Sequence, residues 1–238
     1  MTAHIQQNTV RLDKWGMNTI AKQVLSPILL AVFMFALAET TDWLWGWVFQ
    51  IVHFLAWLMM TVVLVRYNPE LLNRRGRRQA NDKTWDFVLV SIYGITWILM
   101  LVLGALDVRC GWTAPIAPVW HILGNILILL GFALTTWAMA ANRHFEVTVR
   151  IQDDRDHHVI SSGPYRYVRH PGYTGVILAF YFGMPLALGS WPAALAGVLG
   201  LVTMVIRTAL EDRTLQAELP GYSAFTQQTR YRLIPGLW

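Results

Sequence analysis

Long apolar runs separated by polar segments dominate the hydrophobic pattern of this 238-residue chain. A helix needs about 20 apolar residues to cross a hydrocarbon layer of about 30 Å, and most of the runs approach or exceed that length. The pattern predicts six spans: Ile20–Ala38, Trp43–Val65, Trp85–Leu106, Val119–Ala141, Tyr173–Leu188 and Trp191–Leu210. We therefore expect an all-α fold, a polytopic membrane bundle of about six transmembrane helices.

The connections between the runs differ greatly in length. Gly189 and Ser190 alone separate the last two runs, which predicts a tight antiparallel hairpin. The last helix should continue to Leu219, where Pro220 and Gly221 end it. The segment 142–172 instead has no apolar run, and a connection beyond about 15 residues is usually functional or disordered.

Candidate chemistry concentrates after the fourth span, which suggests a division into two regions. We expect residues 1–141 to form a four-span membrane region. Residues 142–238 would combine the long polar loop, the helical hairpin and a polar, aromatic tail, and would carry the functional site.

Composition and charge support a membrane protein. Hydrophobic residues make up 55% of the chain and charged residues 14%, whereas a soluble domain carries about a quarter charged residues. Of the 19 Lys and Arg residues, 18 lie in or next to segments that six spans place on one side, and Arg109 alone lies opposite, which predicts cytoplasmic termini and a cytoplasmic 142–172 loop. This topology explains the net charge of +5 better than nucleic-acid binding does, and in a bacterium the membrane would be the plasma membrane. The single cysteine, Cys110, excludes an internal disulfide.

The most chemically crowded stretch is SSGPYRYVRHPGY, residues 161–173. Pro171 suits the first turn of a helix, and His170 would then be the capping residue. The free backbone amides of that first turn could donate hydrogen bonds to an anion. The alternative is an ordinary capped membrane helix whose Arg169 reaches lipid headgroups.

A second candidate site lies near the end of the sixth run. Arg207 and Glu211 are four residues apart and share one helix face, whereas Asp212 points elsewhere. They form either a simple ion pair or one wall of a polar cavity, since charged residues inside spans usually face such a cavity.

A metal site is a further alternative, formed by Asp153, Asp154, Asp156, His157 and His158. The carboxylates are almost consecutive and no H-x-x-x-H spacing occurs, so we favour solvated loop charges and predict no metal.

The motif SGPYRYVRHPGYTG, followed one hairpin later by R-x-x-x-E-D-x-x-L, resembles the isoprenylcysteine carboxyl methyltransferase family of integral membrane enzymes. Phospholipid N-methyltransferases and methanethiol S-methyltransferases are more distantly similar. The resemblance covers Asn142 to the C-terminus, about 40% of the chain, and its paired motifs are more specific than HPGY alone.

The resemblance implies an S-adenosylmethionine-dependent methyltransferase with its pocket on the cytoplasmic face. Arg207 would bind the substrate and act in catalysis with Glu211. Arg150 stands where the family has a cofactor-binding glutamine, and Glu211–Asp212 replaces a pair of glutamates. The implied cofactor contacts are His157, His158, Val159, Ile160, Tyr165, His170, Pro171, Gly172, Tyr173 and Glu211.

The acceptor is expected to be a lipophilic small molecule with an isoprenylcysteine-carboxylate-like or thiol-like group, because Arg207 suits an anion better than an amine. Phospholipid amine N-methylation stays open, as does an NADPH-dependent sterol-type reductase, which has a similar C-terminal architecture. A non-enzymatic transporter or scaffold is the third class. The expected surroundings are membrane lipids, with no nucleic acid and no obligate protein partner.

Overall fold

The computed structural model describes residues 11–75, 83–152 and 156–238, and in these ranges it is helical without strands. Six of its helical segments are long and apolar enough to cross a membrane, which confirms the predicted fold class. They are α1 Lys14–Ala38, α2 Leu44–Tyr67, α4 Thr84–Cys110, α5 Pro118–Ala141, the continuous rod Pro171–Leu188, and α8 Trp191–Glu218.

The rod Pro171–Leu188 changes its winding along its length. It begins as α6 (Pro171–Val176), widens into the π-helical segment η3 (Ile177–Gly183), and ends as α7 (Met184–Leu188). Gly189 then takes a left-handed conformation with φ of 69°, and the Ser190 side chain accepts a hydrogen bond from the amide of Ala193 to start α8. The chain thus reverses between Leu188 and Trp191, where the sequence predicts the hairpin.

Three segments depart from the sequence expectations. α1 begins earlier than Ile20 because the Asp13 carboxylate accepts hydrogen bonds from the amides of Trp15 and Gly16. The predicted polar loop after α2 contains the short helix α3 (Pro69–Arg75). The tail contains α9 (Tyr222–Gln228), which the sequence analysis missed.

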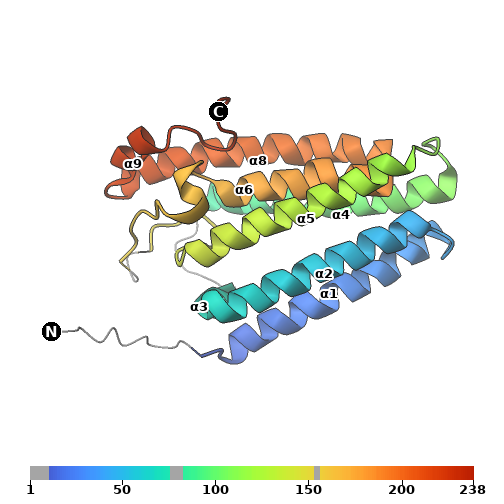
Figure 1. Ribbon diagram of the computed structural model, residues 1–238, viewed down its shortest axis with the longest axis horizontal. Helices are drawn as coiled ribbons and strands as arrows, with labels where there is room; N and C mark the ends of the chain where they lie inside the picture. The colour runs from blue at the N-terminus through green and yellow to red at the C-terminus, as the bar shows by residue number, and fades with distance from the viewer. Residues whose placement is uncertain (1–10, 76–82, 153–155) are drawn as a thin grey trace.

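The spans pack as one bundle (Figure 1), with α5 lying against both α2 and the rod Pro171–Leu188, and α4 lying against α8. Small residues allow α5 and the rod to approach closely. A Cβ atom added at Gly131 would lie 2.7 Å from the amide nitrogen of Ala179, and one added at Gly183 would lie 2.9 Å from the carbonyl of Gly124. Helices in membranes often associate through such small residues. The division at residues 141 and 142 stays a functional prediction.

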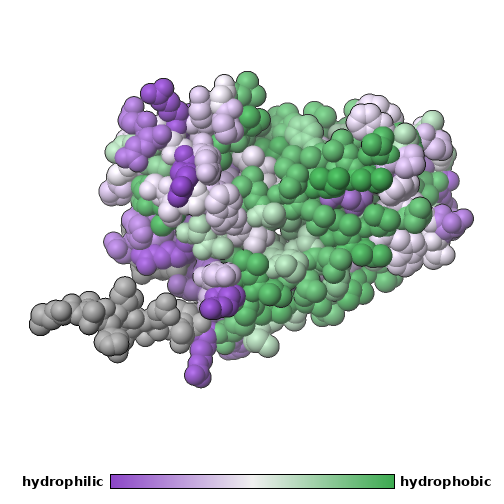
Figure 2. All heavy atoms as spheres, in the orientation of Figure 1, coloured by the Kyte–Doolittle hydropathy of each residue, from purple (hydrophilic) through white to green (hydrophobic). Residues whose placement is uncertain are grey.

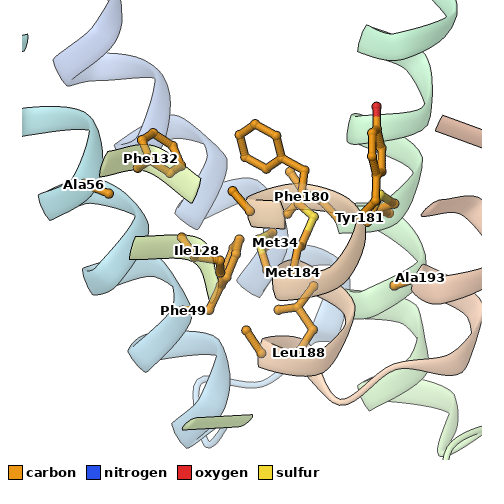
Figure 3. Packing of buried hydrophobic residues seen from close by; sticks show 14 of the residues in the cluster. Met34, Phe49, Ala56, Ile128, Phe132, Phe180, Tyr181, Met184, Leu188 and Ala193 are labelled. Atoms are coloured by element: carbon orange, nitrogen blue, oxygen red, sulfur yellow. The ribbon is translucent and has the colours of Figure 1, made fainter. Parts of the chain in front are cut away.

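The buried apolar core draws side chains from all six spans, and Figure 3 shows Phe132 of α5 and Phe180 of η3 within it. Their rings make an edge-on contact with centroids 5.7 Å apart. Many large apolar side chains instead face outward, and Figure 2 shows them as an apolar band over the middle of the bundle. Such a surface is unfavourable in water and suits hydrocarbon.

Polar residues gather at one end of the bundle in Figure 2, near α3, α9 and the start of α6. We call this end the basic end, because Arg74, Arg75, Arg169, Arg230 and Arg232 lie there. Arg109, at the end of α4, lies at the opposite end and forms an ion pair of 2.9 Å with Glu39.

Candidate functional site

A polar cleft lies at the basic end, between the segment 142–170, the start of α6, the end of α8 and α9. Its cavity volume is about 100 Å³. Pro171, the first residue of α6, is buried and is not among the described lining residues. The other predicted cofactor contacts line the cleft: His157, His158, Val159, Ile160, Tyr165, His170, Gly172, Tyr173 and Glu211.

Glu211 is held on the cleft wall by Tyr173. The Tyr173 hydroxyl donates a short hydrogen bond to Glu211 Oε2, which links α6 to α8. The rings of Tyr173 and His170 lie parallel, with centroids 5.6 Å apart. A carboxylate and two stacked rings therefore form one continuous wall of the cleft.

The start of α6 has less anion-binding capacity than expected. The amides of Tyr173 and Thr174 both donate to the His170 carbonyl, at 3.0 and 3.1 Å. Pro171 has no amide hydrogen. The predicted anion-binding role therefore narrows to the amide of Gly172, for which the described backbone offers no acceptor.

Arg207 packs over the Tyr173 ring but is not among the residues that line the polar cleft. Its guanidinium carbon is 4.9 Å from the ring centroid. Its carboxylate partner is Asp86 of α4, at 2.7 and 3.2 Å, and it also donates to the Val147 carbonyl. Arg207 therefore pairs with Asp86 and not with Glu211, so the alternative of a simple Arg207–Glu211 ion pair is wrong.

Asp212 has a different role from its neighbour Glu211. It is fully buried and accepts hydrogen bonds from Arg169 at 2.7 and 2.9 Å and from Arg232 at 2.9 Å. Tyr222 and Gln216 also donate to it, and His170 Nε2 lies 3.3 Å away. Asp212 thus joins α8 to the loop, α9 and the tail beneath the cleft.

The C-terminal tail is fixed to the same place through its backbone. The amides of Arg169 and His170 donate to the carbonyls of Tyr231 and Arg232, both at 2.9 Å. Arg169 Nη1 also donates to the carbonyls of Thr229 and Arg230. Because Arg169 is 6% exposed, the alternative in which it reaches lipid headgroups is wrong.

Two buried tyrosines border this network outside the spans. Burial raises the pKa of Tyr222 above its ordinary value, and the nearby Asp212 and Glu211 carboxylates raise it further. Burial likewise raises the pKa of Tyr165, although a hydrogen bond from Asn142 opposes the shift. Both hydroxyls consequently stay protonated and remain able to donate hydrogen bonds at neutral pH.

The loop contributes polar groups that the sequence analysis missed. Gln152 is 1% exposed, lines the cleft, and donates from Nε2 to the His144 carbonyl at 2.7 Å. Arg150, whose role the sequence left open, also lines the cleft and forms a buried ion pair with Glu146 at 2.7 Å. Gln152 lies only two positions from Arg150, so it offers a glutamine to the same cleft.

The alternative metal site gains no support from the described ranges. Asp153 and Asp154 lie outside them. Within the described residues, no three His, Cys, Asp or Glu side chains converge in a way that would hold a metal ion.

A second, apolar cavity of about 200 Å³ adjoins the polar cleft within the bundle. Phe145, Glu146 and Tyr173 line both, so the two spaces share a wall. The rest of the cavity is lined mainly by apolar and aromatic residues, with Arg75 and Arg207 as its cations: Trp57, Met60, Tyr93, Phe132, Thr135, Met139, Val147, Val176, Ala179, Phe180 and Met204.

Comparison with known proteins connects this part of the fold to membrane methyltransferases. Residues 119–219 match the model of the phospholipid methyltransferase family. Probable protein-S-isoprenylcysteine O-methyltransferases from two subspecies of rice, Oryza sativa indica and japonica, are each 33% identical over 62 residues. These matches cover 25% of this chain and 32% of each relative.

The chain thus matches about a third of the length of these curated relatives. The matched family region contains α5, the rod Pro171–Leu188 and α8, which carry Tyr173, Arg207 and Glu211. The resemblance to isoprenylcysteine and phospholipid methyltransferases that the motifs indicated is confirmed.

Proposed function

We propose that this chain is an integral membrane methyltransferase that uses S-adenosylmethionine in the polar cleft and a lipophilic acceptor in the apolar cavity. The observation that carries the proposal is the meeting of the two spaces at Phe145, Glu146 and Tyr173. Methyl transfer is an in-line displacement, so its catalysis consists mainly of holding donor and acceptor on opposite sides of the methyl group.

The donor set of the cleft fits the cofactor chemically. The Glu211 carboxylate is suited to its ammonium group or its ribose hydroxyls. The Gly172 amide at the start of α6 suits its carboxylate. Val159, Ile160 and Tyr165 supply apolar surface for its adenine ring.

When bound, S-adenosylmethionine supplies a methyl group on a positively charged sulfur, and attack on that methyl group leaves a neutral thioether. A carboxylate or thiolate acceptor is already anionic and needs no general base. Tyr173 orients Glu211 on the cofactor side, while its ring faces Arg207 on the acceptor side. Arg207 in turn orients the acceptor, and the buried walls exclude water that would compete with it.

Equilibrium binding to the full-length protein in detergent separates the function classes. We expect S-adenosylmethionine to bind and NADPH not to bind. Binding of NADPH alone would favour the sterol-type reductase and contradict the methyltransferase proposal. If a correctly folded preparation binds neither compound, a transporter or scaffold becomes the better explanation.

Phospholipid amine N-methylation is the second candidate, and the phospholipid methyltransferase match favours it. Turnover assays with radiolabelled S-adenosylmethionine should compare prenylated cysteine with phosphatidylethanolamine. Methyl transfer to the carboxylate is expected, whereas transfer to the amine alone would replace that acceptor assignment.

We further propose that the basic end and both termini face the cytoplasm. Cys110 is exposed at the opposite end, so labelling of its thiol reports which side of the membrane that end faces. A membrane-impermeant maleimide should label Cys110 in intact cells. The matched variant, Cys110→Ser with Ala224→Cys in α9, should be labelled only after permeabilisation, and the reverse result would invert the topology.

A further inference from the structure

Arg75 is a cation of the apolar cavity for which the fold provides no carboxylate partner among the described residues. It is the last residue of α3, and its Nε atom is buried without a hydrogen-bond acceptor in the described ranges. Its guanidinium lies 6.0 Å from the centroid of the Phe145 ring, on the wall shared by the two spaces. Arg74 beside it has an acidic partner, Glu146, at 3.1 Å.

Glu146, which lines the cavity, and Asp86 are already engaged by other arginines. Glu146 pairs with Arg74 and with Arg150. Asp86 pairs with Arg207. The positive charge of Arg207 is therefore balanced by Asp86, whereas no carboxylate among the described residues balances that of Arg75.

Arg75 is half-buried, and a charge that is partly removed from water without a partner is unfavourable unless something completes the site. Burial lowers the pKa of Arg75 to about 10, which still leaves the guanidinium protonated at neutral pH. Arg75 and Arg207 both lie close enough to Tyr93 to act electrostatically on its hydroxyl. The end of the cavity nearest the polar cleft is consequently positive, while Phe132 and Phe180 form an apolar portion.

We propose that Arg75 binds the anionic group of the acceptor and selects amphiphiles that carry a carboxylate or phosphodiester. The apolar chain of the acceptor then lies toward Phe132 and Phe180, and Arg207, held by Asp86, orients the reacting group. This inference rests on the proposed function, because it assigns the apolar cavity to the acceptor. It adds a specificity-determining residue from α3, a segment outside both the motifs and the matched family region.

The test measures binding of two matched probes to the purified full chain in uncharged detergent. One is N-acetyl-S-farnesylcysteine, a carboxylate, and the other is its uncharged carboxamide. The wild-type protein should bind the carboxylate at least about tenfold more tightly than the amide, and Arg75→Gln should remove that preference while leaving amide affinity unchanged. The control is Arg66→Gln, which removes an exposed arginine at the end of α2 and should preserve the preference.

Results that contradict the role of Arg75 differ from results that contradict the methyltransferase proposal. Equal wild-type affinity for both probes, or a preference that survives Arg75→Gln, would overturn the role of Arg75 even where S-adenosylmethionine binds normally. If the wild-type protein does not bind S-adenosylmethionine, the proposed function is wrong. If Arg75→Gln does not fold, the wild-type preference and a reduced preference in Arg75→Lys carry the test.

A third probe identifies the source of the anion. Single-chain lysophosphatidylethanolamine carries a phosphodiester next to an amine. If it displaces the farnesylated carboxylate and its affinity falls in Arg75→Gln, then Arg75 also accepts a phosphodiester. Failure to displace restricts the site to carboxylates.

Discussion

The polar cleft and the apolar cavity share a wall but differ in the charged groups that they present beside Tyr173. The cleft presents the Glu211 carboxylate, whereas the cavity presents the guanidinium groups of Arg75 and Arg207. A cationic methyl donor and an anionic acceptor would each meet the complementary charge on its own side of Tyr173. The difference suggests that charge sorts the two reactants before the geometry of the shared wall aligns them.

The same separation occurs between adjacent residues of α8. Glu211 faces the cleft and accepts a hydrogen bond from Tyr173, whereas Asp212 is fully buried below it. The Glu211 carboxylate is available to a ligand, whereas the Asp212 carboxylate forms ion pairs with Arg169 and Arg232. Replacing each of them in turn separates binding from support of the fold.

Asp212→Ala should have the largest effect. Removing this carboxylate leaves the buried guanidinium of Arg169 unpaired, which typically costs about 3–5 kcal/mol in folding free energy. Thermal unfolding in detergent should show the loss. The matched control is Glu218→Ala, which removes an exposed ion pair with Lys83 and should cost about 0.2–1 kcal/mol. Equal stability of the two variants would contradict the supporting role of Asp212.

Glu211→Ala should weaken S-adenosylmethionine binding by roughly 1.5–3 kcal/mol, because it removes a charged hydrogen-bond acceptor from the cleft. Its folding free energy should change much less than that of Asp212→Ala. Isothermal titration with the cofactor measures the first effect, and unchanged affinity would remove Glu211 from the site.

The counterpart on the cavity side is Arg207→Lys. Lysine keeps a charge for Asp86 but lacks the planar fork that makes two hydrogen bonds. We expect a higher KM for the acceptor with unchanged affinity for S-adenosylmethionine. A defect confined to the cofactor would show that the two spaces are not sorted in this way.

The sequence was informative about the cleft because the cleft residues lie in motifs that resemble those of a methyltransferase family, and that resemblance implied the cofactor contacts. Residues 157–173 and Glu211 lie in polar or charged positions beside apolar runs, where a charge is conspicuous. The six spans followed from run length alone. Asp212 could not be distinguished from Glu211, since its role depends on Arg232 and Tyr222, which reach it from a tail with no regular spacing.

The apolar cavity could not be predicted from the sequence, for a different reason. Its walls come from α2, α3, α4, α5, α6, η3, α8 and the loop residues 145–147, and apolar residues that line a cavity have the same pattern as those that face lipid. One signal was present and was missed. Asp86 is a carboxylate within the predicted span Trp85–Leu106, and an ionisable residue there calls for a partner, which the fold supplies as Arg207.

Tyr173→Phe gives the smallest expected change and the finest test of the shared wall. Phenylalanine keeps the ring that faces Arg207 but loses the hydroxyl that donates to Glu211. S-adenosylmethionine affinity should therefore fall by about 0.5–1.5 kcal/mol, while acceptor affinity should stay unchanged. Tyr173→Leu also removes the ring, so it should add an acceptor defect of about 0.5–2 kcal/mol from the lost cation–π contact. If the two variants affected both ligands equally, Tyr173 would not divide the donor side from the acceptor side, and the sorting of reactants by charge would need another boundary.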